Sequence, residues 1–189
     1  MREIYIIRHG ETEWARDGKH TGLTDIPLTE KGEVQAALLG RRIERINFSH
    51  IFSSPLKRAK ETCTICGFNG EIDKDLVEWD YGAYEGMTSE ETLKTLPDWK
   101  IFTHGAPAGE SIEDVIKRAD RFIKKVEGLE EKIAVFSSGH FSRALTMRWL
   151  EIPLENGTRF PLFTASLSIL GYEKKLRSIK LWNDISHLK

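Results

Sequence analysis

The sequence contains little that would direct the protein to a membrane, to nucleic acid or to an oxidising compartment. Of its 189 residues only two are cysteine, and 28 Lys and Arg nearly balance 29 Asp and Glu, for a formal net charge of −1. Nucleic acid and membrane surfaces both favour a basic face, so neither is expected as the main partner. No apolar run approaches the roughly 20 residues that cross a bilayer, and the N-terminal segment lacks a secretion signal. We expect a cytoplasmic protein with one domain, 1–189.

The two cysteines, Cys63 and Cys66, have the C-x-x-C spacing of redox pairs and of half zinc sites. No second Cys or His pair at ligand spacing accompanies them. Three residues apart on a predicted helix, they share one face, and burial beside Ile65 and Phe68 is the simpler explanation. We interpret both as structural and expect no metal.

Apolar segments of two different periods alternate along the chain. Short β-branched and aromatic runs predict strands at 4–7, 51–52, 133–136, 167–172 and 176–182. Helical spacing predicts helices that begin near residues 29, 54, 111 and 139. This alternation predicts a three-layer α/β/α sandwich with a mostly parallel central sheet, helices on both faces and an antiparallel edge from the closing hairpin. The irregular residues 88–109 predict a short helix and a loop that form a lid or a wall of the site.

Polar residues suited to anions follow three of the predicted strands. Arg8-His9-Gly10 ends the first strand, and Gly10 would let the backbone approach a ligand. Ser54-Pro55 is a strong helix start that places Arg58 in the first turn, and His140 lies at the third junction. Each motif alone is also typical of a solvent-facing charge cluster. Because ligands of such sheets bind at the carboxyl ends of the strands, their convergence favours an anion site.

A stretch dense in carboxylates and aromatic residues, 76–86, supplies candidates for acid catalysis. A carboxyl group beside aromatic bulk can have its pKa raised by desolvation, which suits a general acid. Glu78, Asp80 and Glu85 all qualify, and spacing does not choose between them.

Several segments, in this order along the chain, resemble the histidine phosphatase superfamily, also called the phosphoglycerate mutase-like family. They are Arg8-His9-Gly10-Glu11-Thr12, Thr21-Gly22-Leu23-Thr24-Asp25, Leu28-Thr29-Glu30-Lys31-Gly32, Ser53-Ser54-Pro55-Leu56-Lys57-Arg58-Ala59, Glu78-Trp79-Asp80-Tyr81-Gly82 and Gly139-His140. Within the family the likeness is greatest to the branch that contains the fungal sedoheptulose-1,7-bisphosphatases, through residues 12–14, 20–25 and 78–86.

The resemblance implies a role for each of five residues. His9 would attack phosphorus and carry the phosphoryl group, while Arg8, Arg58 and a cationic His140 would surround its oxygens. Glu78 takes the family's general-acid position, with Glu85 as the rival that the spacing leaves open.

Further residues are expected to bind substrate. The resemblance places Thr12, Thr21, Gly22 and Tyr81 beside the phosphate and the substrate. Phe141 departs from the small residue often found after the second catalytic histidine and is expected to narrow or stack on the entrance. No metal or cofactor is implied.

Hydrolysis of a small phosphorylated metabolite, such as a sugar phosphate or bisphosphate, is the favoured function. The family's mutases place an asparagine where this chain has Ala15, and they carry longer basic insertions where residues 88–109 offer only Lys94, Lys100 and His104. A phosphoglycerate mutase is therefore the alternative, and an inactive phospholigand-binding module is a minor one because the catalytic set is complete. The substrate and the oligomeric state, including a homo-oligomer, stay open.

Overall fold

A six-stranded sheet forms the centre of the computed structural model, which describes residues 2–129 and 131–189. The strand order is β3-β2-β4-β1-β5-β6. The strands are β1 (Glu3–Arg8), β2 (His50–Ser53), β3 (Glu71–Ile72), β4 (Lys132–Ser137), β5 (Leu167–Glu173) and β6 (Leu176–Asp184). The β1–β4, β2–β4 and β2–β3 pairs are parallel, whereas β5 runs antiparallel to β1 and β6. The predicted mostly parallel sheet with an antiparallel edge is confirmed. The two-residue β3 was not predicted because it is too short to show a period.

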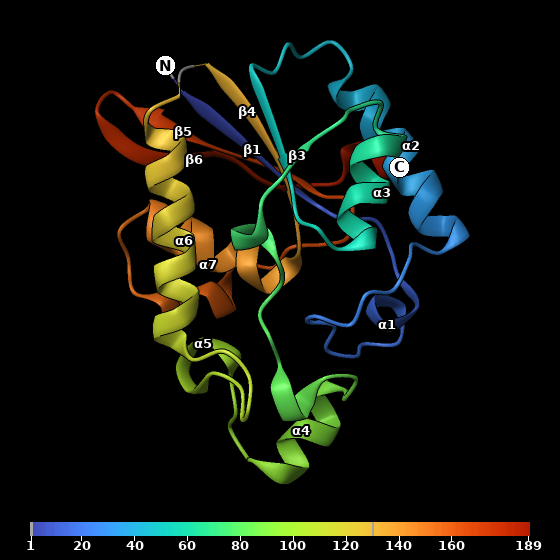
Figure 1. Ribbon diagram of the computed structural model, residues 1–189, viewed down its shortest axis with the longest axis vertical. Coiled ribbons are helices and arrows are strands. Elements are labelled where there is room, and N and C mark those ends of the chain that lie inside the picture. Colours follow the sequence, from blue (N-terminus) through green and yellow to red (C-terminus); the bar gives the residue numbers. More distant parts are fainter. Residues whose placement is uncertain (1, 130) are drawn as a thin grey trace.

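Helices cover both faces of this sheet (Figure 1). They are α1 (Glu13–Arg16), α2 (Glu30–Ile43), α3 (Lys57–Ile65), α4 (Ser89–Thr95), α5 (Ile101–His104), α6 (Ile112–Glu127) and α7 (Gly139–Trp149), with 3₁₀ turns η1 (Lys74–Leu76), η2 (Gly82–Tyr84), η3 (Leu154–Arg159) and η4 (Ser186–Leu188). Helices α6 and α7 pack on one face, and α2 and α3 pack on the other. The layered α/β/α architecture is therefore as expected.

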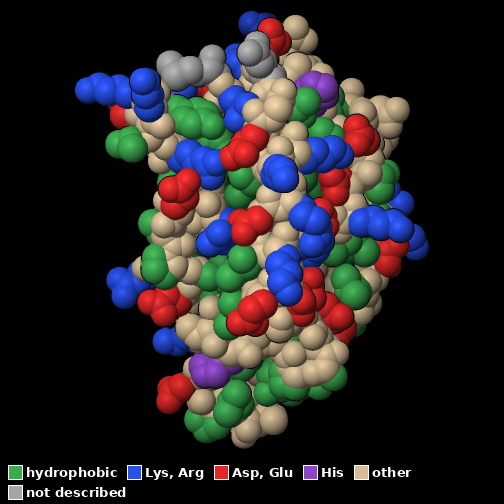
Figure 2. Space-filling model, turned by 60° about the vertical axis from the view of Figure 1, so that its left-hand side comes forward, with side chains coloured by type: hydrophobic (Ala, Val, Ile, Leu, Met, Phe, Trp, Pro, Cys, Tyr) green, Lys and Arg blue, Asp and Glu red, His purple; other side chains and the backbone are tan. Residues whose placement is uncertain are grey.

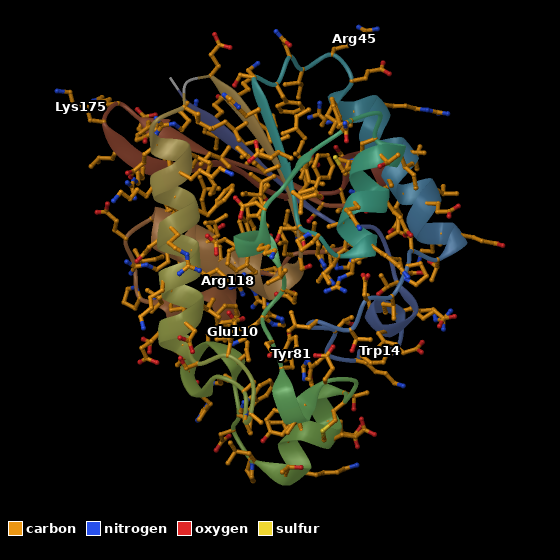
Figure 3. All side chains as sticks on the ribbon, viewed as in Figure 1. Trp14, Arg45, Tyr81, Glu110, Arg118 and Lys175 are labelled. Carbon is orange, nitrogen blue, oxygen red and sulfur yellow. The ribbon has the colours of Figure 1, made fainter. Side chains whose placement is uncertain are left out.

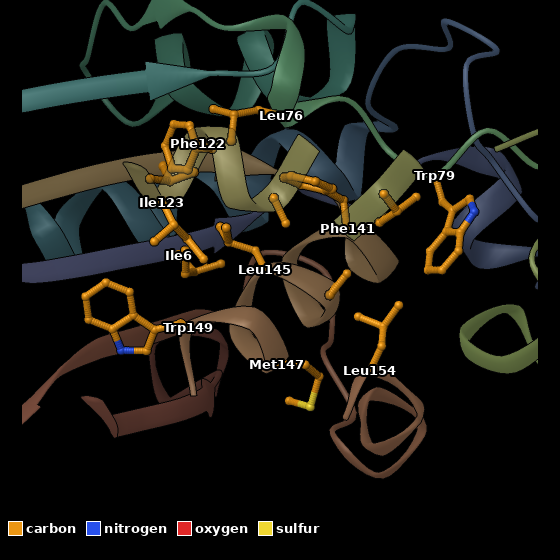
Figure 4. Close-up of a cluster of buried hydrophobic side chains, with 14 of the residues drawn as sticks. Ile6, Leu76, Trp79, Phe122, Ile123, Phe141, Leu145, Met147, Trp149 and Leu154 are labelled. Carbon is orange, nitrogen blue, oxygen red and sulfur yellow. The ribbon is translucent and has the colours of Figure 1, made fainter. Parts of the chain in front are cut away.

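Two hydrophobic clusters hold the layers together. Alternate residues of β1 point to opposite faces, as the strand period requires: Ile4 and Ile6 join the cluster under α6 and α7, while Tyr5 and Ile7 join the cluster under α2 and α3. Figure 4 shows the larger cluster, in which Phe141 and Leu145 of α7 meet side chains of α6 and of the sheet.

Helix α3 begins two residues later than Ser54-Pro55 predicted, with Leu56 in place of Ser54 at the N-cap. Leu56 is still extended, and Ser54 Oγ accepts only a long hydrogen bond of 3.4 Å from the Leu56 N–H. The cap comes from a distant loop instead, because Asp25 Oδ1 accepts the Lys57 N–H at 2.6 Å. Arg58 nevertheless lies in the first turn, as expected.

The segment 88–109 contains two short helices, α4 and α5, where one was predicted. Thr88 and Glu91 form a capping box at the start of α4. Thr88 also pairs with Lys19, and the His20 N–H donates to Met87 O at 2.8 Å. These backbone bonds connect the segment to the loop that follows α1.

The cysteines are free and buried, on and just after α3. The Cys63 thiol lies 3.7 Å from Phe68 O, and the Cys66 thiol lies 3.3 Å from Ala36 O. Burial raises the pKa of Cys63 to about 11 and that of Cys66 to about 12. Both thiols are therefore protonated and unreactive near neutral pH.

Acidic and basic side chains are interspersed on the face shown in Figure 2. Ion pairs join Arg121 to Asp75 and Lys125 to Asp73 on the outer side of α6. Within residues 2–129 and 131–189, no helix has the length and apolarity needed to cross a membrane.

Close backbone packing connects the end of β1 to α2. A Cβ on Gly10 would lie 2.4 Å from Gly32 O, and a Cβ on Gly32 would lie 2.1 Å from Glu11 O. Gly10 was expected to let the backbone come close to a ligand. In the structure it lets the backbone come close to α2 instead.

Gly32→Ala should therefore lower the free energy of unfolding by about 1–3 kcal/mol, because backbone atoms must move to admit the methyl group. Gly128→Ala is the matched control, since no atom lies within 4 Å of the added Cβ and φ is −80°. It should be neutral or slightly stabilising. Urea unfolding of both variants measures the difference, and equal effects would contradict this account of the packing.

Candidate active site

A cavity of about 210 Å³ opens at the carboxyl ends of the parallel strands. Six of the predicted site residues line it: Arg8, His9, Thr21, Glu78, Tyr81 and His140. Figure 3 shows Tyr81 on the segment that descends from the sheet toward α4, on the side facing α1. The structure thus brings most of the predicted set into one place.

His9 follows β1 and is only 4% exposed. Its Nδ1 lies 2.7 Å from Gly10 O. A carbonyl can only accept, so Nδ1 carries the proton and the lone pair is on Nε2. Burial, together with the charges of Arg58 and Arg8, holds the pKa of His9 well below its usual value of 6.5. His9 is therefore a neutral imidazole with the tautomer that a nucleophile needs.

Two guanidinium groups, one partly and one fully buried, flank His9 without a carboxylate partner. Arg8 donates to Leu162 O, and fully buried Arg58 donates to Thr24 O at 2.9 Å and Gly22 O at 2.7 Å. Neither forms an ion pair among the described residues. The Nε atoms of both are buried and unpartnered within the same part of the chain. Buried donors without partners call for an explanation, and for Arg8, which lines the cavity, a bound anion would supply it. Arg58 lies behind the residue 21–24 loop and does not line the cavity itself.

Ser138 is a buried polar residue next to the site that the sequence motifs did not single out. Arg8 pairs with Ser137 across the sheet, and the His9 N–H donates to Ser137 O at 3.0 Å, so Ser138 lies level with His9. Its Oγ is buried and has no partner among the described residues. The signal was its place immediately after a strand that pairs with β1.

Of the three candidate carboxylates, only Glu78 lines the cavity. Its Oε1 accepts the N–H groups of Trp79 and Phe141 at 2.8 and 2.7 Å, and its Oε2 accepts that of His140 at 2.9 Å. Both oxygens are thus oriented by backbone, two of the three donors belonging to the first turn of α7.

The rival carboxylates stabilise loops. Glu85 Oε1 accepts the N–H groups of Gly22 and Thr24 at 2.8 and 3.1 Å. Asp80 Oδ1 accepts the Gly82 N–H at 2.9 Å. These bonds favour Glu78 as the acid that faces a ligand.

His140 is uncharged in the free protein, and the cation expected at this position belongs to the state with phosphate bound. Burial and the charges of Arg143, His20 and Arg8 hold its pKa well below 6.5. Burial also raises the pKa of Tyr81 well above its usual value, so the Tyr81 hydroxyl keeps its proton and donates to His140 Nδ1. The proton of the neutral His140 ring is therefore on Nε2.

The predicted substrate-binding residues divide into two groups. Thr21 and Tyr81 line the cavity, whereas Thr12 caps α1 through a 3.2 Å bond from the Ala15 N–H. The Gly22 N–H is occupied by Glu85. Phe141 was expected at the entrance, but its side chain is fully buried in the core, because the first turn of α7 directs it toward α6.

Four further polar residues line the cavity: Lys19, His20, Ser89 and Arg143. Arg143 is the most distinctive, because its Nε donates to Gly157 O at 2.8 Å and its guanidinium lies 4.8 Å from the Phe102 ring. Its position three residues after His140, on the same helix face, was the signal that the sequence offered.

Fold and cavity together define an α/β protein that holds a neutral histidine beside unpaired arginines. The family pattern described as "Histidine phosphatase superfamily (branch 1)" matches residues 4–185. The chain is 39% identical over 189 residues to an acid phosphatase of Mycobacterium tuberculosis, covering 97% of this chain and 93% of that protein. It is 32% identical over 184 residues to the sedoheptulose 1,7-bisphosphatase of Saccharomyces cerevisiae, covering 79% and 68%. The solved structure of the open reading frame Rv3214 from Mycobacterium tuberculosis has a TM-score of 0.93 and 37% identity, covering 96% of this chain and 97% of that one.

This chain belongs to the histidine phosphatase superfamily, branch 1. The family that its motifs indicated is confirmed, and so is the phosphatase class of enzyme, since the relatives named above are phosphatases.

The buried neutral His9 predicts a loss of stability in acid. As the pH falls below 6.5, the unfolded chain binds a proton on His9, whereas the folded protein does not. The stability that the neutral His9 contributes is therefore fully present above pH 6.5 and is lost progressively below it. Each pH unit below 6.5 should cost about 1.4 kcal/mol of the free energy of unfolding from this group. In His9→Asn this part of the dependence of the free energy of unfolding on pH should vanish. Urea unfolding between pH 7.5 and 5 compares the two, and parallel curves would refute the burial of an uncharged imidazole.

Proposed function

We propose that the protein is a metal-independent phosphomonoesterase that works through a phosphohistidine on His9. The observation that carries the proposal is the neutral His9 ring, with its lone pair on Nε2, beside the unpartnered Nε atoms of Arg8 and Arg58. A phosphate dianion in the cavity would accept hydrogen bonds from Arg8, which lines it, and would balance the charge of Arg8 together with that of Arg58 behind the residue 21–24 loop.

In the first step, His9 Nε2 attacks phosphorus and the bond from phosphorus to the ester oxygen breaks. The leaving oxygen takes the proton of the Glu78 carboxyl group, which would have to be protonated when the ester binds. Arg8 and Arg58 stabilise the charge on the oxygens, and we assign the Nε2–H of His140 to the same task.

In the second step, the Glu78 carboxylate takes a proton from water while the water oxygen attacks phosphorus. The nitrogen–phosphorus bond breaks, inorganic phosphate leaves and Glu78 is again protonated. The fixed direction of both Glu78 oxygens supports one group serving both steps.

We propose a small substrate, such as a sugar phosphate or bisphosphate. The cavity of about 210 Å³ is smaller than the roughly 300–1,000 Å³ typical of sites for drug-sized ligands. Beyond the His9 end, Arg143 and Lys19 add positive charge that would suit a second acidic group. The sedoheptulose bisphosphatase relative is named for a substrate with two phosphates.

The remaining features of the proposal concern the whole chain. We propose one histidine phosphatase domain over residues 1–189, with the segment 88–109 as the outer wall of the site, since Ser89 lines the cavity. The cytoplasmic location and a homo-oligomer stay predictions. The mutase alternative is disfavoured because small, apolar Ala15 lines the cavity and offers no anchor for a second substrate group.

A panel of phosphorylated metabolites in EDTA tests the activity. We expect phosphate release, fastest from small esters with a second acidic group, and an acid-labile phosphoenzyme that disappears in His9→Ala. No release from any ester would reject the proposal, and a labelled phosphoenzyme in His9→Ala would reject the nucleophile. Conversion of 3-phosphoglycerate to 2-phosphoglycerate faster than hydrolysis would select the mutase instead.

The role of Glu78 as the general acid is tested by comparing esters with good and poor leaving groups. Glu78→Gln should slow alkyl phosphates by about 100-fold or more and p-nitrophenyl phosphate much less, because a good leaving group needs little protonation. Glu85→Gln is the matched control, since Glu85 accepts hydrogen bonds from a loop and does not line the cavity. Any loss of rate in this variant should be equal for the two esters. Equal losses in Glu78→Gln with a selective loss in Glu85→Gln would reverse the assignment.

A further inference from the structure

The segment that carries Glu78 has no strand or helix of its own to hold it. It follows η1 and runs through Val77 to Asp80 before η2 begins. Such irregular backbone needs other partners for its carbonyl and N–H groups when it is buried. One buried side chain of α6, Arg118, donates to two of the segment's carbonyl groups, those of Val77 and Glu78.

All five N–H donors of Arg118 are used. Nη1 donates to Asp75 O at 2.6 Å and to Val77 O at 2.8 Å, and Nη2 makes a longer bond of 3.4 Å to Glu78 O. The remaining N–H groups, on Nε and Nη2, form a two-pronged ion pair with Glu110, at 2.8 Å each. Figure 3 shows Arg118 and Glu110 near the N-terminal end of α6.

Glu110 holds the other side of the same segment. Its Oε2 accepts the Asp80 N–H at 3.1 Å, and its carbonyl oxygen accepts the Trp79 Nε1–H at 3.0 Å. The ion pair therefore fixes the backbone on both sides of Glu78.

The Arg118 guanidinium also reaches the helix that orients the carboxyl group. It lies 4.3 Å from the centre of the Phe141 ring. The Phe141 N–H is one of the donors to Glu78 Oε1, at 2.7 Å. Arg118 thus contacts both parts of the arrangement, the segment that carries Glu78 and the helix turn that directs its oxygens.

We propose that the Arg118–Glu110 pair is a positioning device that keeps the Glu78 carboxyl group aimed at the leaving oxygen. Neither residue lines the cavity, so the pair acts through Glu78 and not on the substrate. The inference rests on the proposed acid role of Glu78. A planar fork with five donors is needed, and lysine, with one ammonium group, cannot make these bonds.

The first test replaces Arg118 by lysine, which keeps the charge and loses the fork. Arg118→Lys should lower the rate on alkyl phosphates by about ten-fold or more relative to p-nitrophenyl phosphate, as loss of an orienting partner does. The matched control is Arg121→Lys, because Arg121 lies on the same helix, is 60% exposed and binds only the Asp75 side chain. Its ratio of the two rates should stay within two-fold of wild type. A merely structural role would lower both rates of Arg118→Lys equally, and that result overturns the proposal.

A second test combines the substitutions of Arg118 and Glu78 in one double variant. If Arg118 acts through the carboxyl group, adding Arg118→Lys to Glu78→Gln should leave the ratio of the two rates unchanged, whereas independent effects would multiply. A further selective loss in the double variant overturns the proposal. An unchanged ratio in Glu78→Gln alone overturns the acid assignment itself, which separates the two failures. Should Arg118→Lys fail to fold, Glu110→Gln replaces it in both tests, with the same expected loss and the same contrary results.

Discussion

The parallel pairing of β1 with β4 is the constraint on which the site depends. Arg8 lies opposite Ser137, so both strands end at the same level and deliver their next residues, His9 and Ser138, to one edge of the sheet. The helix that follows β4 begins at once, and its first N–H groups donate to the Glu78 carboxyl group above that edge. Carboxyl ends of parallel strands and helix N-termini both favour anions, and here they coincide. A shift of one residue in this pairing would move His9 away from α7 and its N–H groups.

The second constraint is electrostatic. The buried guanidinium of Arg118 is neutralised by Glu110, whereas no ion pair joins Arg8 or Arg58, beside His9, to a carboxylate among the described residues. Leaving charge uncompensated in a buried place costs stability and is retained where it serves a ligand. Burial is the main reason that His9 and His140 stay uncharged in the free protein, and the charge of Arg8 adds to it at both rings. One arrangement would thus serve both the proposed nucleophile and the proposed oxyanion binding.

Sequence patterns predicted most of the fold, because long elements repeat a clear period. Helix α6, with its Ser111 cap, and the hairpin of β5 and β6 are examples. The patterns were less reliable where a partner from elsewhere in the chain decides the local structure. The start of α3 is capped by Asp25 across the fold, and the close approach of Gly10 is to Gly32 of α2. The expectation for Phe141 was wrong because the direction of a side chain on a helix depends on how that helix is rotated against the sheet.

By itself, the sequence determined the kinds of groups present: a histidine and arginines at strand ends, three carboxylates in one aromatic stretch, and the order of strands and helices. These follow from local composition and period, which need no knowledge of distant contacts. Only the tertiary structure decided which carboxylate faces the cavity, that Arg143 lines it with His9 and His140, and which imidazole nitrogens carry protons. Those outcomes depend on strand register and on hydrogen bonds between residues about 60 positions apart, such as the bonds from α7 to Glu78, and no local pattern contains that information.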